Sequence, residues 1–450
     1  MAFITLKQAA LWCGGYVEPK YENVEFLGAC NDTRVLQPGQ LFIVLQGARD
    51  GHDFIPAAME KGAAAVLCSR KVGDYPCILV DDPRIALGII AREERKRLGC
   101  KVVGITGSVG KSTTKEMVAS VLETTYRISK TPANHNNDIG MPMAILAIPE
   151  DTQVAVLEMG MNHFREMAYL SQIALPDVAA IVNIGTMHIE FLGSREGIRQ
   201  AKLEILEGMA PEGKLLLSGD DDMLCPLPYE IPQVVTYFGT GDAHGVRAVD
   251  ICQEPELLRY TVVTGDGTFP VEMALEGKHF VIDSLCAVAV GLELGVTPEK
   301  ICDGLAAFRN MAGRQETFRK GGCTIIKDCY NAGPESMAAS LAVLGARSGR
   351  RIAVLGDMLE LGDCAPAEHE KVGVLAAKNA DLVLAYGPNG CYVVKGAASQ
   401  GMTEAKCFET REEMADALSA VAREKDVILF KGSRGMRLEL VLERFLKDRE

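Results

Sequence analysis

The chain has 450 residues, of which 48% are hydrophobic and 24% are charged. This length and composition predict a folded protein of several domains and exclude a disordered or fibrous chain. The formal charge of -13 argues against a nucleic-acid partner, because binding to a phosphate backbone relies on an excess of clustered Lys and Arg.

Residues 1–98 combine short apolar runs with turn-rich stretches. The runs at 41–46, 63–67 and 77–80 predict strands, and residues 85–99 predict a helix that closes the region. We therefore expect a small N-terminal α/β domain over residues 1–98.

From Lys101 onward, strand-like and helix-like segments alternate, which predicts a mostly parallel sheet flanked by helices. We expect this central α/β domain to cover residues 99–312. Its first predicted strands are 101–106, 153–160, 177–185 and 213–218, with a helix at 111–123. A more strand-rich part follows at 234–239, 258–265 and 269–275, before helices at 280–295 and 298–308.

A third strand and helix series begins near Arg314 and predicts a Rossmann-like C-terminal domain over residues 313–450. The expected fold class is therefore α/β with three domains. The strands predicted in this part are 323–328, 351–358, 381–387 and 426–432, and the helices are 334–345, 369–379 and 437–448.

The cysteines and the N-terminus predict where the protein works. The 14 cysteines are scattered from Cys13 to Cys407 without a C-x-x-C pair or the spacing of a disulfide framework or zinc site, which favours a reducing cytosol. The first twenty residues lack the features of a signal peptide, and no stretch of about 18 apolar residues occurs. We expect a cytoplasmic protein with no membrane span.

A glycine-rich turn between the strand 101–106 and the helix 111–123 is typical of a nucleotide-phosphate site, because backbone N–H groups and the helix dipole converge there on an anion. Lys111 would reach the β- and γ-phosphates, and the Ser112 hydroxyl would hold Mg²⁺. The spacing departs from the strict G-x-x-x-x-G-K-[ST] pattern, since Ile105 stands where the first glycine is expected. The predicted ATP contacts in this loop are Thr106, Gly107, Ser108, Val109, Gly110, Lys111, Ser112 and Thr113.

Three ionisable residues follow the phosphate loop. Glu158 ends a predicted strand, and His188 follows the next one by a few residues, so both would face the ligand crevice at the carboxyl edge of the sheet. Lys202 lies on an amphipathic helix. Each also has a structural interpretation, as a capping carboxylate, a neutral hydrogen-bonded histidine or a solvated lysine.

The segments T-G-x-x-G-K-S-T, E-M-G-M-N, N-I-G-x-x-H and A-K-x-E-I occur together and in order, and this set resembles the central domain of the Mur ligases. The resemblance implies that Glu158 and His188 bind Mg²⁺ and that Lys202 is carbamylated and supports a second Mg²⁺. Carbamylation turns a cation into an anion, which explains a lysine beside two metals. Lys111, Glu158, His188 and Lys202 would then be the catalytic residues.

Residues 31–55 resemble the UDP-binding domain shared by the tripeptide-forming and D-alanyl-D-alanine-adding Mur ligases. This implies that Asp32, Thr33 and Arg34 face the UDP-sugar, although a D-T-R turn is otherwise an ordinary polar loop. Residues 131–142 resemble a substrate-facing loop. Its Asn134, Asn136 and Asn137 are predicted substrate contacts or turn formers.

Three C-terminal segments resemble the D-alanyl-D-alanine-adding member specifically. They are A-G-R-Q-E at 312–316, K-D-C-Y-N-A-G-P-E-S-M at 327–337, with Tyr330, and V-L-G-D-M-L-E-L-G at 354–362, with Asp357 and Glu360. The resemblance implies that Arg314, Asp328 and Asn331 contact ATP from a C-terminal domain that closes over it. It also places Lys431, Ser433 and Arg434 near the incoming dipeptide, although a plain helix start with exposed charge is an equal alternative for this segment. Arg314 and Asp328 also have structural interpretations, as a surface charge and a strand-end cap.

One segment departs from the family. Where H-N-x-x-N is usual around adenine, this chain has His279-Phe-Val-Ile-Asp283. Phe280 and Asp283 replace two amides, so we expect the base to be held by stacking or by backbone groups.

The resemblance implies ATP-dependent ligation of D-alanyl-D-alanine to UDP-N-acetylmuramoyl-tripeptide through an acyl phosphate. The products would be ADP, phosphate and the UDP-muramoyl-pentapeptide of peptidoglycan synthesis, which serves cell-wall biogenesis, cell shape and cell division. We expect a monomer with two Mg²⁺ sites. The alternatives are another Mur or folylpolyglutamate-type amide ligase, and a non-catalytic nucleotide-binding homologue.

Overall fold

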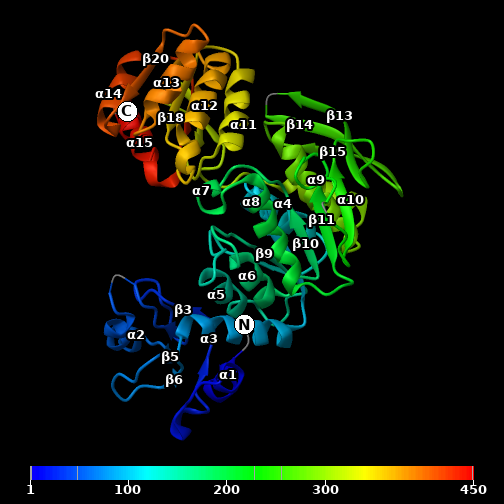
Figure 1. The fold of residues 1–450 in the computed structure, drawn as a ribbon, viewed down its shortest axis with the longest axis vertical. Coiled ribbons are helices and arrows are strands. Elements are labelled where there is room, and N and C mark those ends of the chain that lie inside the picture. Colours follow the sequence, from blue (N-terminus) through cyan, green and yellow to red (C-terminus); the bar gives the residue numbers. More distant parts are fainter. Residues whose placement is uncertain (1–2, 48, 228, 255, 448, 450) are drawn as a thin grey trace.

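The structure is a computed structural model that describes residues 3–47, 49–227, 229–254, 256–447 and 449. Figure 1 shows three lobes in an arc, with the N-terminal and C-terminal lobes at the two ends and a large sheet between them. Each lobe contains a sheet with parallel strands and helices against it. The fold is therefore α/β with three domains, as the sequence predicts; the boundaries at residues 98 and 312 stay predictions.

The N-terminal lobe is built on a parallel sheet with the strand order β3-β4-β5-β6. Its strands are short because turn-forming residues interrupt the apolar runs, and β4 ends at Ile43 rather than at 46. The elements are β1 (Ile4–Thr5), α1 (Leu6–Cys13), β2 (Glu25–Phe26), β3 (Ala29–Cys30), β4 (Leu41–Ile43), α2 (Ile55–Glu60), β5 (Ala65–Cys68) and β6 (Cys77–Leu79).

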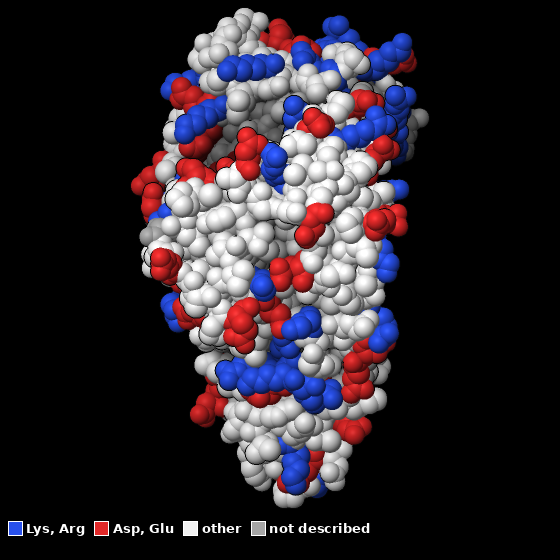
Figure 2. Space-filling model, turned by 90° about the vertical axis from the view of Figure 1, so that its right-hand side faces the viewer, with Lys and Arg blue, Asp and Glu red and all other residues white. Residues whose placement is uncertain are grey.

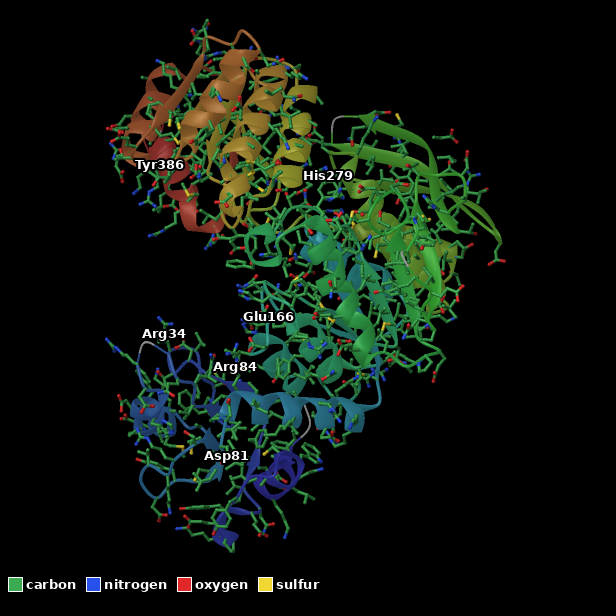
Figure 3. The ribbon with its side chains drawn as sticks, viewed as in Figure 1. Arg34, Asp81, Arg84, Glu166, His279 and Tyr386 are labelled. Carbon is green, nitrogen blue, oxygen red and sulfur yellow. The ribbon has the colours of Figure 1, made fainter. Side chains whose placement is uncertain are left out.

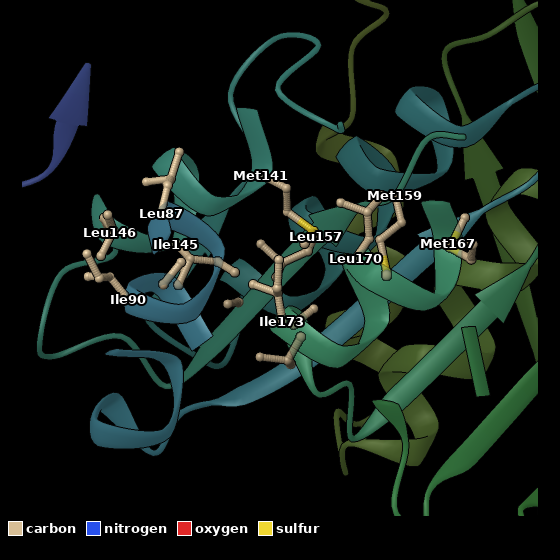
Figure 4. Close-up of a cluster of buried hydrophobic side chains, with 14 of the residues drawn as sticks. Leu87, Ile90, Met141, Ile145, Leu146, Leu157, Met159, Met167, Leu170 and Ile173 are labelled. Carbon is tan, nitrogen blue, oxygen red and sulfur yellow. The ribbon is translucent and has the colours of Figure 1, made fainter. Parts of the chain in front are cut away.

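Helix α3 (Pro83–Leu98) joins the N-terminal lobe to the central one. Asp82 caps its start, and Gly99 ends it in a left-handed conformation. Figure 4 shows its Leu87 and Ile90 among side chains of α5 (Gly140–Leu146) and α6 (Glu166–Ala174). Full burial of one such side chain contributes about 1.5–3 kcal/mol. The apolar core is thus continuous between the two lobes.

The central sheet has the order β15-β14-β13-β12-β11-β10-β7-β9-β8, in which β14 pairs antiparallel with both β13 and β15 and the other pairs are parallel. The sequence missed β8, which has only three residues, and β13, whose alternating pattern buries one face. The strands are β7 (Lys101–Thr106), β8 (Ile128–Lys130), β9 (Val154–Glu158), β10 (Val178–Ile181), β11 (Lys214–Ser218), β12 (Val234–Gly239), β13 (Val246–Glu254), β14 (Leu257–Thr264) and β15 (Gly267–Met273). The other helices are α4 (Lys111–Glu123), α7 (Ile189–Leu192), α8 (Arg195–Leu203), α9 (His279–Glu293) and α10 (Pro298–Ala307).

Strand β7 lies between β9 and β10, and this order positions the candidate site. Ile105 is in register with Glu158 on one side and with Ala180 on the other. The loops that follow the three strands therefore leave the sheet side by side at its carboxyl edge, where open α/β sheets bind ligands.

The C-terminal sheet has the order β16-β17-β21-β18-β19-β20, with only its edge strand β16 antiparallel among the described strands. The sequence missed the edge strands β16 and β20, which are largely exposed. Residue 448, the last of the predicted helix 437–448, lies outside the described residues. The elements are β16 (Glu316–Lys320), β17 (Cys323–Asp328), α11 (Pro334–Ala346), β18 (Arg351–Gly356), α12 (Ala365–Asn379), β19 (Leu382–Tyr386), α13 (Gly390–Ser399), β20 (Ala405–Phe408), α14 (Arg411–Val421), β21 (Val427–Lys431) and α15 (Glu439–Lys447).

The charges on the surface and the lengths of the helices indicate whether the protein could cross a membrane. Figure 2 shows Lys and Arg interspersed with Asp and Glu over the face in view. Within the described ranges, every helix is too short or too polar to cross a membrane.

Candidate active site

The phosphate loop leaves β7 and turns directly into α4. Gly110 has a φ of 82°, a left-handed conformation that glycine adopts without strain, and the helix begins at Lys111. The Lys111 ammonium donates to the carbonyl oxygens of Gly107 and Ser108, at 2.8 and 3.0 Å. Burial lowers the pKa of Lys111, and the charge of Glu158 opposes that shift. The loop thus presents a partly buried cation beside a helix N-terminus, a suitable site for phosphate.

Asn183, two residues after the end of β10, holds this loop in place. Its Oδ1 accepts from the backbone N–H groups of Ser108 and Val109, at 3.0 and 2.9 Å, and its Nδ2 donates to the Val109 carbonyl at 2.9 Å. Gly185 N–H also donates to Ser108 Oγ at 2.9 Å. Asn183 was not among the predicted site residues, although the strand-end rule that selected Glu158 applies equally to it.

Glu158 is buried beside the phosphate loop, with 2% of its surface exposed. Asn136 Nδ2 donates to its Oε1 at 2.7 Å, whereas its Oε2 has no hydrogen-bond partner. The Lys115 ammonium lies 4.0 Å from Oε2 and donates to the Thr131 carbonyl. Oε2 of Glu158 is therefore free of hydrogen bonds, apart from the ion pair with Lys115, and could bind a cation, since a buried oxygen without a hydrogen bond is costly. Lys115 is a second residue that the sequence analysis missed.

His188 follows β10 and has a φ of 66°, in the left-handed region. Its Nδ1 lies 2.6 Å from Oε2 of Glu360, which comes from the C-terminal domain. Burial lowers the pKa of His188, and the hydrogen bond to Glu360 opposes that effect. With Nδ1 engaged, Nε2 is the ring nitrogen that a metal could use.

Lys202, on α8, is 1% exposed, so the structural interpretation of this residue as a solvated lysine is wrong. No described carboxylate lies within 4 Å of its ammonium, and burial together with the charge of Lys111 lowers its pKa far below the ordinary value. This shift favours the neutral amine relative to that of an exposed lysine, and a neutral amine is the form that reacts with CO₂. This environment fits the predicted carbamate, which itself stays a prediction.

The predicted metal ligands fit a divalent cation in their chemistry. No group of three or more His, Cys, Asp and Glu side chains gathers as a metal site in the part of the chain that the structure describes. The predicted set is of another kind, because it combines the Ser112 hydroxyl and a carbamate with one carboxylate and one imidazole. The free oxygen of Glu158 is the observation that supports a hard cation such as Mg²⁺.

Arg314 brings the C-terminal part of the chain onto the phosphate loop. Its Nη2 donates to Ser112 Oγ at 2.9 Å, and its guanidinium stacks 4.2 Å from the centre of the Tyr330 ring. A guanidinium held in this way is well suited to bind phosphate oxygens. Arg314 is therefore at the site and is not an isolated surface charge.

The other predicted C-terminal residues are mostly engaged within their own domain. Asp328 accepts from Lys431 Nζ at 2.6 Å and from Ser340 Oγ, and the charge of Lys431 lowers its pKa against the effect of burial. Ser433 accepts from Leu359 N–H at 3.0 Å. Among the rest, Asn331 accepts from the N–H of Ala332, and Arg434 is exposed. Contacts of these residues with ATP or the dipeptide stay predictions.

The predicted UDP residues lie on the N-terminal lobe, apart from the phosphate loop. Figure 3 shows Arg34 on that lobe and His279 at the junction of the central and C-terminal lobes. Arg34 pairs with Asp32 at 2.6 Å, and the Thr33 carbonyl accepts from Lys61 at 2.6 Å. Their contact with UDP stays a prediction.

The three asparagines of residues 131–142 have different roles. Asn136 holds Glu158 as described, and its backbone N–H donates to the Asn134 carbonyl at 2.8 Å. Asn137 Oδ1 accepts from Gly140 N–H at 2.8 Å, within the turn that leads into α5. Asn137 therefore forms the turn, and substrate contacts of all three stay predictions.

The segment that departs from the family opens helix α9. Phe280 is buried, and Asp283 lies under the phosphate loop, where it accepts from Thr114 Oγ1 at 3.0 Å. A Cβ added to Gly110 would meet Asp283 Oδ1 at 2.6 Å. Burial raises the pKa of Asp283 to about 7. Asp283 thus lies against the phosphate loop and supports it. How this segment holds adenine stays a prediction.

Two parts of the chain match known domains. Residues 105–291 match the Mur ligase middle domain, and residues 313–434 match the Mur ligase glutamate ligase domain. A curated Bacillus subtilis protein named "UDP-N-acetylmuramoyl-tripeptide--D-alanyl-D-alanine ligase" is 40% identical, with 97% of this chain and 96% of that protein covered. The Escherichia coli protein of the same name is 34% identical, with 91% and 92% covered.

Solved structures give the same result for the fold. MurF from Acinetobacter baumannii superposes with a TM-score of 0.91 at 31% identity, over 99% of both chains. The MurF ligase of Thermotoga maritima, solved in complex with ADP, superposes with a TM-score of 0.83 at 30% identity, over 94% of this chain and 97% of that one.

Proposed function

Because the chain belongs to the Mur ligase family, we propose that it is the ligase that joins D-alanyl-D-alanine to UDP-N-acetylmuramoyl-tripeptide at the expense of ATP. The product is the UDP-muramoyl-pentapeptide used in peptidoglycan synthesis, with release of ADP and phosphate. Full-length relatives of that name support the choice of substrates. The observation that supports the chemistry is the free, buried oxygen of Glu158 beside the phosphate loop.

The reaction requires activation of a carboxylate. An amide is unstable relative to its acid and amine in water, so the tripeptide carboxylate first takes the γ-phosphoryl group of ATP to give an acyl phosphate. The amine of D-alanyl-D-alanine then displaces phosphate. Two anions must meet in the first step, and Lys111 and Arg314 offset their repulsion because both lie at the phosphate loop. A protein nucleophile is not required.

Glu158 and His188 would hold Mg²⁺ together with Ser112, and carbamylated Lys202 would serve a second ion. The metal, when bound, supplies positive charge to the transferring phosphoryl group. Asn136 fixes one Glu158 oxygen and Glu360 fixes the His188 ring, so that the other oxygen and Nε2 keep their lone pairs for the ion. The buried position of Lys202 favours the neutral amine that carbamylation needs.

The three domains have different roles in binding the substrates and in excluding water. The C-terminal domain, docked on the phosphate loop through Arg314, would exclude water and protect the acyl phosphate. The N-terminal lobe would hold the UDP-sugar through Asp32, Thr33 and Arg34. Asn134, Asn136 and Asn137 would contact the tripeptide arm, and Lys431, Ser433 and Arg434 the dipeptide.

A phosphate-release assay with each substrate omitted in turn tests the proposal. We expect release to need ATP, Mg²⁺, UDP-N-acetylmuramoyl-tripeptide and D-alanyl-D-alanine together, with one amide formed per phosphate. Release that is independent of the dipeptide and the tripeptide would refute the assignment. A parallel series with L-lysine, diaminopimelate or glutamate as the amine separates it from other amide ligases of the superfamily.

We also place the reaction in the cytoplasm and assign it to a monomer. Both proposals follow from the sequence analysis and are tested by cell fractionation and by light scattering of the purified chain.

A further inference from the structure

Residues 183–188, here called the bridging loop, lie between β10 and α7. The first half of this loop is fixed to the central domain. Asn183 braces the phosphate loop as described, and Ile184 N–H donates to Asp221 Oδ2 at 2.7 Å. The Ile184 carbonyl accepts from Arg195 Nη2 at 2.8 Å, and Gly185 N–H donates to Ser108 Oγ at 2.9 Å. A shift of the bridging loop would therefore move the phosphate loop as well.

The second half of the bridging loop is held by the C-terminal domain. Glu335 Oε1 accepts from the Thr186 backbone N–H at 2.9 Å and from Thr186 Oγ1 at 3.1 Å. Two residues later, His188 pairs with Glu360. Glu335 lies in the first turn of α11, and Figure 1 shows this helix above α7. The loop thus joins the phosphate site to the C-terminal domain.

The contact around Glu335 is a close fit. A Cβ added to Gly185 would meet Glu335 Oε1 at 2.6 Å, and one added to Gly333 would meet Met187 Sδ at 2.4 Å. The other oxygen of Glu335, Oε2, is buried and has no hydrogen-bond partner. Both side-chain hydrogen bonds recorded for Glu335 in the described part of the chain go to Thr186, so Glu335 can fix the loop only when the loop and α11 are in contact.

We propose that Glu335 is a positioning residue that fixes the bridging loop, and through it the phosphate loop, when the C-terminal domain is docked. It touches Thr186 and, among the described residues, neither Lys111 nor Glu158, so its effect on nucleotide would be indirect. The effect of Glu335 on catalysis rests on the proposed function. Its effect on nucleotide binding can be measured separately.

The test compares the affinity for magnesium ADP, by calorimetry, with kcat for phosphate release in the full-length chain. Glu335→Ala should weaken ADP binding by about tenfold and lower kcat, because hydrogen bonds to a charged acceptor are lost. Glu335→Gln keeps an acceptor for both donors of Thr186 and should stay within about threefold of the wild type. Thr186→Val removes only the hydroxyl donor and should weaken binding by about threefold.

A double-mutant cycle and a matched control complete the design. The variant with both Glu335→Ala and Thr186→Val should bind ADP as weakly as Glu335→Ala alone, because the two side chains share one interaction. Glu412 occupies the equivalent position in the first turn of α14 and is exposed, so Glu412→Ala should leave ADP affinity unchanged.

Three results would overturn the proposal. They are an unchanged ADP affinity in Glu335→Ala, a Glu335→Gln variant as weak as the alanine variant, and losses that multiply in the double variant. If Glu335→Ala does not fold, Thr186→Val decides by itself, and an unchanged affinity overturns the proposal. Failure of the proposed function shows differently, as a wild-type chain that releases no phosphate on addition of the dipeptide.

Discussion

His188 and Glu360 connect two domains through a hydrogen bond of 2.6 Å between Nδ1 and Oε2, although 172 positions separate them in the chain. The hydrogen bond lowers the pKa of Glu360, so the carboxylate accepts and the imidazole N–H donates. This arrangement fixes the tautomer of His188 and leaves the lone pair on Nε2, a common feature of histidines that bind metals.

Glu360→Ala should lower kcat by about 10- to 100-fold and raise the Mg²⁺ concentration needed for half-maximal phosphate release. The reason is that the His188 ring loses the partner that orients it. Titration of activity with Mg²⁺ measures both effects. Glu370→Ala, which removes only a surface ion pair with Lys395, is the control and should behave as the wild type. An unchanged Mg²⁺ requirement in Glu360→Ala would contradict this role.

Lys111→Ala should reduce kcat by roughly 10²–10³-fold, because the cation at the phosphate loop no longer offsets the charge of the transferring phosphoryl group. Initial rates of phosphate release at saturating ATP provide the measurement. The exposed Lys300 on α10 serves as a control, and Lys300→Ala should retain full activity. A Lys111→Ala enzyme that forms product at a near-normal rate would be incompatible with the mechanism.

Lys202 should be carbamylated in the active enzyme. Its lowered pKa makes the neutral amine available, so ¹³C-bicarbonate should give a carbamate signal in the NMR spectrum of the wild type and none in Lys202→Ala. Activity should fall in CO₂-depleted buffer and return with bicarbonate. Lys202→Ala should be inactive at every bicarbonate concentration. Activity that does not depend on CO₂, together with no carbamate signal, would contradict the prediction.

Asp283 should make the stability of the protein depend on pH. Burial raises its pKa from 3.8 to about 7 in the folded chain, so folding favours the protonated carboxyl group. Its contribution to the free energy of unfolding is therefore greatest below pH 3.8 and is lost as the pH rises toward about 7. Asp283→Asn keeps an acceptor for Thr114 and has no charge to bury.

Urea unfolding of the wild type and of Asp283→Asn between pH 4 and pH 8 measures this effect. The advantage of the asparagine variant in free energy of unfolding should grow up to about pH 7 and then level off. Asp303→Asn, a change at an exposed position on α10, should show no such trend. A difference between Asp283→Asn and the wild type that is constant with pH would rule out the effect.

Local patterns in the sequence were enough to predict the alternating elements and the phosphate loop. Gly107, Gly110 and Lys111 follow an apolar strand and open a helix, and each of these features depends only on neighbouring residues. The same patterns missed β8, β16 and β20, which are short or exposed edge strands, each held by pairing with one neighbouring strand. Pairing of that kind leaves little periodicity to detect.

The sequence by itself determined the α/β fold class, and it predicted the phosphate loop and, through the family resemblance, the set Glu158, His188 and Lys202. Only the tertiary structure decided how deeply these residues are buried and which residues hold them. Burial shifts the pKa of Lys202, and residues from another domain or loop hold His188 and the bridging loop. These properties depend on solvent exclusion and on contacts between segments far apart in the chain, which no local pattern encodes.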